Sequence, residues 1–288
     1  MSAPYTTLIT VEQLQALQAS GAPLKVFDCT SELMNPEAAD RLYAQVHIAG
    51  AVQAHLDRNL SAPSAADAVN GGRHPLPRRE LFAEWLRDTG FDNTMQAVVY
   101  DRNGASYCGR LWWMLKWAGH EAVAVLDGGL QAWEAAGGAV ESGAPVTPEV
   151  GHFTLSAEKT TLATTPNVAT NLGRPAQTIV DARATPRFRG EMEPLDPVAG
   201  HIPGALNRPF GLNLGPDGRF KSPAELKAEF EALLAGRDPA TVVHHCGSGV
   251  TAVPNLLAME IAGLGRTALY AGSWSEWCNT PGLPCAQG

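Results

Sequence analysis

The stretch VVHHCGSGVTA, residues Val242 to Ala252, is an apolar run that leads into a cysteine followed by two closely spaced glycines. The run that ends near His245 has the composition of a short buried strand. The residues after the glycines continue as an apolar helix, in whose first turn Pro254 is tolerated. A strand, a tight loop and a helix in this order predict one unit of a parallel α/β sheet.

The cysteine of this loop has surroundings suited to chemistry. Cys246 follows the predicted strand, and sites of open parallel sheets lie beyond the carboxyl ends of their strands. Gly247 and Gly249 allow successive backbone N–H groups to point inward as an anion-binding nest at a helix N-terminus. Such a nest favours the thiolate form of a cysteine. We therefore predict that Cys246 is a nucleophile or carries a negatively charged sulfur species, whereas a purely packed thiol would leave both glycines unexplained.

The second half of the chain repeats the first. RELFAEWLRDTG (79–90) resembles AELKAEFEALLA (224–235) at an offset of 145 positions, and LDGGLQAW, which ends at Trp133, resembles YAGSWSEW, which ends at Trp277. Matches in the same order over most of each half indicate two copies of one domain. At the position of Cys246 the first copy has Asp101, which cannot act as a sulfur nucleophile, so we expect this copy to be inactive.

The pattern of each half predicts the fold class. Short β-branched runs alternate with helical stretches such as 79–89 and 223–234, which favours α/β architecture, with a parallel sheet flanked by helices in each of two tandem domains. A segment rich in glycine and proline separates the halves. We expect a first domain at 1–142, a linker at 143–154 and a catalytic domain at 155–288.

Composition narrows the class of protein. The 288 residues are 45% hydrophobic and 17% charged with a formal net charge of −8, which lacks the basic surface that nucleic acids or anionic membranes require. The N-terminus has no secretory signal pattern, and no apolar run is long enough to span a bilayer, so we expect a cytoplasmic protein. The five cysteines show no CxxC spacing and indicate reduced thiols. Four of them are interpreted as structural or incidental: Cys29, Cys108, Cys278 and Cys285.

These features resemble a known family. Tandem domains with Asp101 in the first loop and CGSGVTA in the second resemble the rhodanese superfamily of sulfurtransferases, and the loop is similar to that of the 3-mercaptopyruvate sulfurtransferases. The stretches RLWWML (110–115), GHIPGA (200–205) and GSWSEW (272–277) extend the resemblance over nearly the whole chain. It implies that Cys246 takes sulfur from a donor as a persulfide and passes it to a thiol, to thioredoxin or to cyanide, with no metal or organic cofactor.

The resemblance also implies roles for individual residues. Ser248 would help to handle the proton of the donor sulfur, and Arg187 in DARATPRFRG would hold the anionic end of the donor, with Arg189 as a second candidate. The alternative for Arg187 is a surface ion pair with Glu191 or Glu193. The persulfide would be cradled by backbone N–H groups of Gly247, Ser248, Gly249, Val250 and Thr251.

Two family features are altered or ambiguous in this chain. The mercaptopyruvate-type members show a further arginine before GHIPGA, where this chain has Leu195. They also join the loop serine to a histidine, for which His47 in HIAGA is the candidate. The second copy has a histidine in the same motif, His201, which fits a shared structural role, and the position of the family's acidic partner falls on Pro36.

Several functions remain open at this point. The neutral loop favours 3-mercaptopyruvate over the dianion thiosulfate as sulfur donor, whereas Leu195 favours thiosulfate. A non-catalytic sulfur-carrier or binding module is a further alternative. A cysteine-dependent phosphatase would need an arginine at the position of Ala252. His244 and His245 do not suggest a metal pair, because adjacent residues of a strand point to opposite faces.

Overall fold

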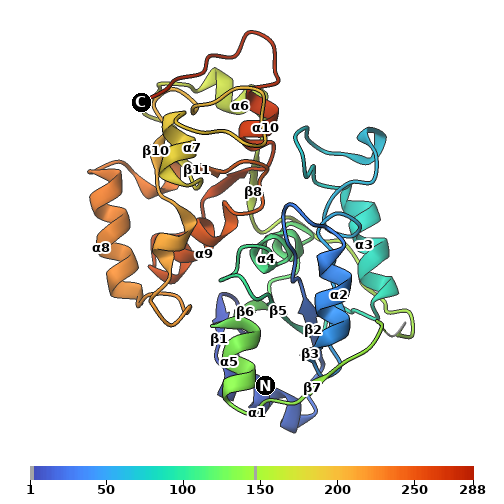
Figure 1. Ribbon diagram of the computed structural model, residues 1–288. Helices are drawn as coiled ribbons and strands as arrows, with labels where there is room; N and C mark the ends of the chain where they lie inside the picture. Colours follow the sequence, from blue (N-terminus) through green and yellow to red (C-terminus); the bar gives the residue numbers. More distant parts are fainter. Residues whose placement is uncertain (1–2, 146–147) are drawn as a thin grey trace. The chain divides into compact units, whose positions relative to one another are not determined.

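The computed structural model describes residues 3–145 and 148–288, so that residues 146 and 147 of the expected linker 143–154 lie outside the described residues (Figure 1). The chain forms two compact units. The first contains the residues up to Asp67 together with Pro77–Lys159 and Pro216–Arg219. The second contains Ala68–Leu76, Thr160–Gly215 and Phe220–Gly288. Each unit therefore includes a short segment from the other half of the sequence.

The first unit is built on a five-stranded parallel sheet with the order β1-β6-β5-β2-β4. Its strands are β1 (Leu8–Ile9), β2 (Leu24–Asp28), β4 (Val52–Gln53), β5 (Gln96–Tyr100) and β6 (Val123–Leu126). A two-stranded antiparallel pair joins β3 (His47–Ile48) to β7 (Val140–Glu141). Its helices are α1 (Val11–Ser20), α2 (Ala38–Gln45), η1 (Ala65–Asp67), α3 (Arg79–Asp88), α4 (Cys108–Trp117) and α5 (Gly129–Ala135).

The second unit contains a five-stranded parallel sheet with the order β10-β9-β11-β12-β8. Its strands are β8 (Thr161–Ala163), β9 (Thr178–Asp181), β10 (Leu206–Asn207), β11 (Val242–His245) and β12 (Ala268–Tyr270). Its helices are α6 (Thr165–Thr170), α7 (Thr185–Arg189), η2 (Phe210–Asn213), α8 (Pro223–Leu234), η3 (Pro239–Thr241), α9 (Val253–Ile261) and α10 (Ser273–Trp277).

The two sheets have the same topology. Strands β1, β2, β4, β5 and β6 of the first sheet take the same places as β8, β9, β10, β11 and β12 of the second. The predicted α/β fold with two parallel sheets flanked by helices is confirmed. The limits 1–142 and 155–288 remain our proposal for the two repeats, and the exchanged segments 68–76 and 216–219 are a finding that the repeat pattern did not anticipate.

Strand β11 occupies the middle of its sheet and is buried on both faces. His244 Nε2 lies 3.2 Å from Met259 Sδ on one face, whereas the His245 ring lies 6.3 Å from the ring of Tyr270 on the other. The expected opposite orientation of the two histidines is therefore confirmed. Because β11 is central and ends at His245, the loop that follows it is held by the core of the unit.

Helix α8 begins and ends where the sequence predicted. The Ser222 hydroxyl accepts a hydrogen bond from the Glu225 N–H at 3.3 Å, and the Glu225 carboxylate accepts one from the Ser222 N–H at 3.0 Å. This capping box satisfies two backbone donors at the helix start. Pro223 at the first helical position needs no N–H partner, which fixes the same boundary.

Candidate active site

The loop after β11 is braced by the residues that open α10. The Cys246 N–H donates to the Ser273 hydroxyl at 3.1 Å, and the Cys246 carbonyl accepts from the Trp274 N–H at 3.0 Å. The Gly247 carbonyl accepts from the Ser275 N–H at 2.9 Å. Cys246 itself is only 1% exposed. The cysteine is thus placed by backbone hydrogen bonds on both sides of the loop rather than by its own side chain.

A glycine is required at position 249. Its φ of +74° lies in the left-handed region, and a Cβ there would lie 2.2 Å from the Ala271 carbonyl oxygen. Any other residue would push the loop away from the segment that follows β12. The glycine spacing that marked this loop in the sequence therefore has a direct structural cause.

The corresponding loop of the first unit shows what such a loop binds. The Asp101 carboxylate accepts four backbone hydrogen bonds of 2.8–3.1 Å. The donors are the N–H groups of Asn103, Ala105, Tyr107 and Cys108. This is an anion in a nest of N–H groups. The first copy supplies its own anion there and has no thiol at that position.

The repeat offset of 145 positions identifies the corresponding N–H groups in the second unit. The N–H groups of Ser248 and Val250 correspond to those of Asn103 and Ala105. Within 3–145 and 148–288, neither of these two N–H groups has a hydrogen-bond acceptor. A negatively charged sulfur on Cys246 is therefore the group that the loop is suited to stabilise.

Ser248 contacts a histidine that the sequence analysis did not single out. His74 Nδ1 lies 2.8 Å from Ser248 Oγ, and both residues are buried. His74 belongs to the segment 68–76, which closes on itself through hydrogen bonds from Val69 N–H to the Leu76 carbonyl at 2.9 Å and from Leu76 N–H to Asn70 Oδ1 at 3.0 Å. A comparison of the two copies could have indicated His74. The second copy has no histidine between His201 and His244, so His74 has no counterpart there.

The expectation that His47 is the partner of the loop serine is corrected. His47 Nδ1 lies 2.8 Å from the Tyr43 carbonyl and Nε2 lies 3.2 Å from Glu141, and its ring stacks on Tyr43 at 3.8 Å. His201 repeats this pattern in the second unit, with Nδ1 2.8 Å from the Phe188 carbonyl and its ring stacked on Phe188 at 3.9 Å. The motif shared by both copies therefore fixes local structure.

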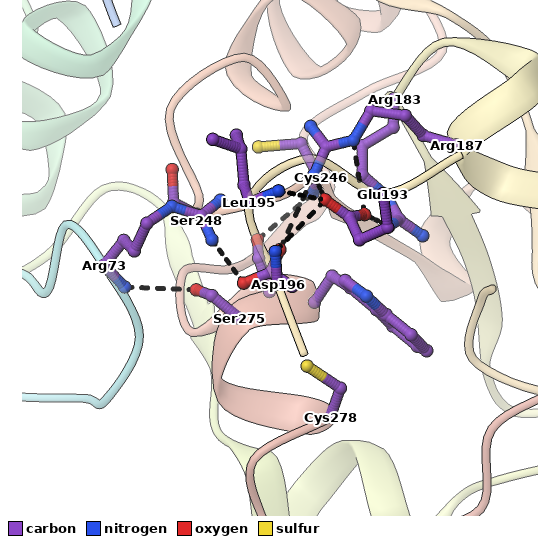
Figure 2. A network of polar contacts seen from close by, with 12 residues as sticks. Arg73, Arg183, Arg187, Glu193, Leu195, Asp196, Cys246, Ser248, Ser275 and Cys278 are labelled. Carbon is purple, nitrogen blue, oxygen red and sulfur yellow. Dashed lines mark hydrogen bonds and ion pairs between the residues drawn. The ribbon is translucent and has the colours of Figure 1, made fainter. Parts of the chain in front are cut away.

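A series of alternating charges lies beside the cysteine loop (Figure 2). Arg183 pairs with Asp181 at 2.7 Å and with Glu193 at 3.2 Å. Arg187 pairs with the same Glu193 at 2.5 Å and lies 3.5 Å from Asp196. Asp196 in turn pairs with Arg73. We refer to Asp181, Arg183, Glu193, Arg187, Asp196 and Arg73 as the charge series.

Two arginines of the charge series approach the residue after Cys246. A Cβ built on Gly247 would lie 3.0 Å from Arg73 Nη2 and 3.5 Å and 3.6 Å from Arg187 Nη1 and Nη2. Arg187 forms the ion pair with Glu193 that was the alternative from the sequence, and its guanidinium also lies near the loop. Arg189 points elsewhere, because its side chain is 57% exposed and lies 3.6 Å from Glu191.

Arg183 and Asp181 form the buried end of the charge series. Burial disfavours the charge of Asp181, but His245 and Arg183 outweigh burial and hold the pKa of Asp181 below its ordinary value. Asp196 differs, because burial outweighs the attraction of Arg73 and raises the pKa of Asp196. Arg183 had no sequence signal, since its burial depends on packing over Trp274, whose ring lies 4.8 Å from the guanidinium carbon.

The other cysteines lie in surroundings that disfavour thiolates. Burial raises the pKa of Cys29 and of Cys108, and it raises the pKa of Cys278 to about 11. Burial also raises the pKa of Cys285. Because the thiolate is the nucleophilic form, none of these four thiols is set up for sulfur chemistry.

Comparison with known proteins identifies the family of this chain. Residues 10–136 and 164–280 each match the Rhodanese-like domain. The chain belongs to the rhodanese-like family. This rhodanese-like protein is 45% identical over 283 residues to the "Probable 3-mercaptopyruvate sulfurtransferase" of Pseudomonas aeruginosa, covering 98% of both chains. It is 33% identical over 281 residues to the thiosulfate sulfurtransferase of Bos taurus, covering 95% of this chain and 92% of the other.

The fold of this rhodanese-like protein is also found among solved structures. The 3-mercaptopyruvate sulfurtransferase from Leishmania major superposes with a TM-score of 0.83 at 30% identity, covering 98% of this chain and 78% of the other. The predicted membership of the rhodanese superfamily is therefore confirmed. Within the part of the chain that the structure describes, no helix combines the length and apolar character needed to cross a membrane.

Proposed function

We propose that this rhodanese-like protein is a sulfurtransferase that takes sulfur from 3-mercaptopyruvate onto Cys246. The observation that carries the proposal is the Asp101 carboxylate in its nest of four N–H groups, because the matching loop of the second unit has a cysteine at that position. The likeness to relatives named 3-mercaptopyruvate sulfurtransferase supports this donor. The backbone of Gly247, Ser248, Gly249, Val250 and Thr251 would cradle the persulfide.

The reaction balances without any cofactor. The Cys246 thiolate attacks the donor sulfur, a sulfur–sulfur bond forms, and the carbon–sulfur bond of the donor breaks. The electron pair of the broken bond remains on carbon as an enolate, which takes up one proton and leaves as pyruvate. The product on the enzyme is the Cys246 persulfide, and no metal or organic cofactor takes part.

Ser248 and His74 form the pair that transfers the proton to the enolate in this proposal. The serine hydroxyl lies 2.8 Å from the imidazole, within hydrogen-bonding distance for proton transfer. In this proposal the pair takes up the proton that the Cys246 thiol loses on ionisation and delivers it to the enolate carbon. Arg187 binds the carboxylate of the donor, since its guanidinium lies beside Gly247 and is suited to bidentate carboxylate recognition.

The second half-reaction needs a thiol acceptor. We propose thioredoxin or a low-molecular-weight thiol, whose thiolate attacks the outer sulfur of the persulfide and releases Cys246. All five cysteines of the chain are free thiols. This supports a reducing compartment, and we propose the cytoplasm as the place of action.

Thiosulfate is the second candidate donor. Arg73 and Arg187 both approach Gly247, and two cations beside the nucleophile suit a dianion. The likeness to the bovine thiosulfate sulfurtransferase favours the same reading. With this donor a sulfur–sulfur bond breaks, sulfite leaves with the electron pair, and no carbon atom takes up a proton.

Intact-protein mass spectrometry tests the proposal. The reduced protein is incubated briefly with 3-mercaptopyruvate or with thiosulfate, beside a Cys246→Ser variant. We expect one added sulfur from 3-mercaptopyruvate in the wild type and none in the variant. Loading from thiosulfate alone would favour the second candidate, and loading from neither donor would contradict both.

A further inference from the structure

We propose that the second unit has a further binding site, which takes a small organic monocarboxylate through Arg208 and Lys221. The site is a cavity of about 410 Å³ formed by α8 and the loop that follows β10 (Figure 1). The lining of this cavity includes Arg208, Leu212, Lys221, Glu229, Ala232 and Leu233. None of the lining residues belongs to the cysteine loop or to the charge series, so the inference goes beyond the proposed function and does not depend on it.

Arg208 is a buried cation that its neighbours hold in one place. Its side chain is only 6% exposed. Its Nε donates to Asn213 Oδ1 at 3.0 Å, Asn213 Nδ2 donates to Asn255 Oδ1 at 2.6 Å, and Asn255 Nδ2 donates to the Arg208 carbonyl at 3.0 Å. The guanidinium carbon also lies 4.2 Å from the centre of the Phe230 ring. Both asparagines are fully buried, so this closed ring of hydrogen bonds fixes the guanidinium beside the cavity.

Arg208 and Lys221 have donors left for a ligand. Arg208 Nη2 donates to the Leu212 carbonyl at 3.4 Å and to Glu229 at 2.8 Å, whereas Nη1 has no acceptor within 3–145 and 148–288. Buried polar groups normally have hydrogen-bond partners. Lys221 Nζ carries three donors, and its acceptor among the described residues is Glu229 Oε1 at 2.7 Å. Since both cations bind the carboxylate of Glu229, they lie close enough together for a second carboxylate to contact both.

The charges of the cavity determine the charge of its ligand. Burial disfavours the charge of Glu229, but Lys221 and Arg208 outweigh burial and lower the pKa of Glu229. With this carboxylate charged, two cations and one anion give the cavity a net charge of +1. A monoanion makes the occupied cavity neutral, whereas a dianion would leave an uncompensated negative charge in a partly buried site.

The remaining wall of the cavity is apolar. It is formed by Leu212, Ala232 and Leu233. Small-molecule sites typically combine such a wall with a few polar groups in volumes of about 300–1,000 Å³. Guanidinium groups are suited to carboxylates. A carboxylate with a short apolar chain therefore fits both parts of the cavity, whereas inorganic phosphate would leave the apolar wall in contact with water.

Ligand-observed NMR with hexanoate tests the site. The titrations use the Arg187→Met background, so that the arginine beside Gly247 does not bind the probe. We expect a dissociation constant of about 1 mM for hexanoate. The neutral analogue hexanamide should bind at least about tenfold more weakly, because it lacks the charge. No binding of hexanoate, equal binding of both probes, or tighter binding of inorganic phosphate would overturn the inference.

A filled cavity locates the probe while the hydrogen bonds of Arg208 stay in place. Ala232 is an exposed residue of α8 that lines the cavity, so Ala232→Trp should weaken hexanoate binding at least about tenfold. Ala224→Trp is the matched control, because Ala224 is an exposed residue of the same helix outside the cavity lining, and binding should be unchanged. Hexanoate binding that survives Ala232→Trp would overturn the inference.

Two further variants test the cations. Arg208→Met should bring the dissociation constants of hexanoate and hexanamide to within about twofold of each other. Because Arg208 also holds the loop through Asn213, Lys221→Met is the second variant, at a side chain that is 25% exposed, and it should lower the preference for hexanoate about threefold. Arg219→Met is the control, since that arginine is 50% exposed and belongs to the first unit. An unchanged preference in Lys221→Met would contradict carboxylate binding by the two cations.

Discussion

His74 Nδ1 lies 2.8 Å from Ser248 Oγ, although the two residues are 174 positions apart in the chain. The contact joins a segment from the first half of the sequence to the loop of the nucleophile within one compact unit. In the proposed function this pair transfers a proton, and its replacement distinguishes the two candidate donors, because only 3-mercaptopyruvate leaves a carbon that must be protonated.

Replacing His74 should therefore affect the donors unequally. We expect His74→Ala to lower kcat with 3-mercaptopyruvate about 100-fold, the lower end of the range for general acid–base catalysis. Persulfide formation from thiosulfate should fall by less than about tenfold, since no carbon is protonated. Ser248→Ala should match His74→Ala, and the double variant should be no slower than either, because the residues act as a unit. An equal loss with both donors would contradict this role.

The Asp101 carboxylate should stabilise the first unit. Replacement by alanine removes the acceptor of four backbone N–H groups, and we expect a loss of about 3 kcal/mol in the free energy of unfolding. Urea unfolding followed by circular dichroism measures the change. Asp217→Ala is the control, because that carboxylate is 65% exposed. A change of less than about 0.5 kcal/mol in Asp101→Ala would show that the nest does not need its anion.

Stability should fall in mild acid because of His244. Burial is the largest cause that lowers the pKa of His244 to about 3, with His245 and Arg208 adding to the effect. Between about pH 6.5 and pH 3 the unfolded chain binds a proton that the folded chain excludes, so the free energy of unfolding decreases as pH falls through this window. The contribution approaches about 1.4 kcal/mol per pH unit.

A variant isolates this contribution. His244→Gln should flatten the pH dependence of urea unfolding between pH 6.5 and pH 5, whereas His152→Gln, at an exposed position, should leave it unchanged. Burial also lowers the pKa of His245, so part of the slope should remain in His244→Gln. An unaltered slope in His244→Gln would mean that His244 is already charged in the folded protein.

Gly249→Ala should remove sulfur loading. The new Cβ would meet the Ala271 carbonyl at 2.2 Å in a left-handed backbone conformation, so the loop must shift. We expect the mass increase on Cys246 to be lost with every donor. Gly263→Ala is the control, since φ there is +72° but a Cβ meets nothing within 4 Å. Loading in Gly249→Ala at the wild-type rate would show that the loop geometry is not critical.

The sequence was sufficient for the features that depend on local pattern. The repeat, the two parallel sheets and the loop of Cys246 follow from spacing and from residue type, and the structure contains them. The role of Arg187 stays a proposal, but its position beside Gly247 agrees with the interpretation of its motif.

The sequence did not predict the features that depend on tertiary packing. His47 was the candidate because of the family resemblance, whereas the recurrence of its motif in both copies indicated the structural stacking that His47 and His201 share. His74 and Arg73 lie in a segment whose membership of the second unit has no local signature. His74, which has no counterpart in the second copy, is the histidine that contacts Ser248.

The segment 68–76 links the two halves of the chain, because it comes from the first half and belongs to the second unit. A duplicated domain without a cysteine in its loop could be deleted if it only flanked the other domain. Here the first half provides nine residues to the other unit, among them the histidine beside Ser248. Deletion of the first half would remove these residues as well, so the unit that contains Cys246 cannot be separated from the first half without losing part of its own structure.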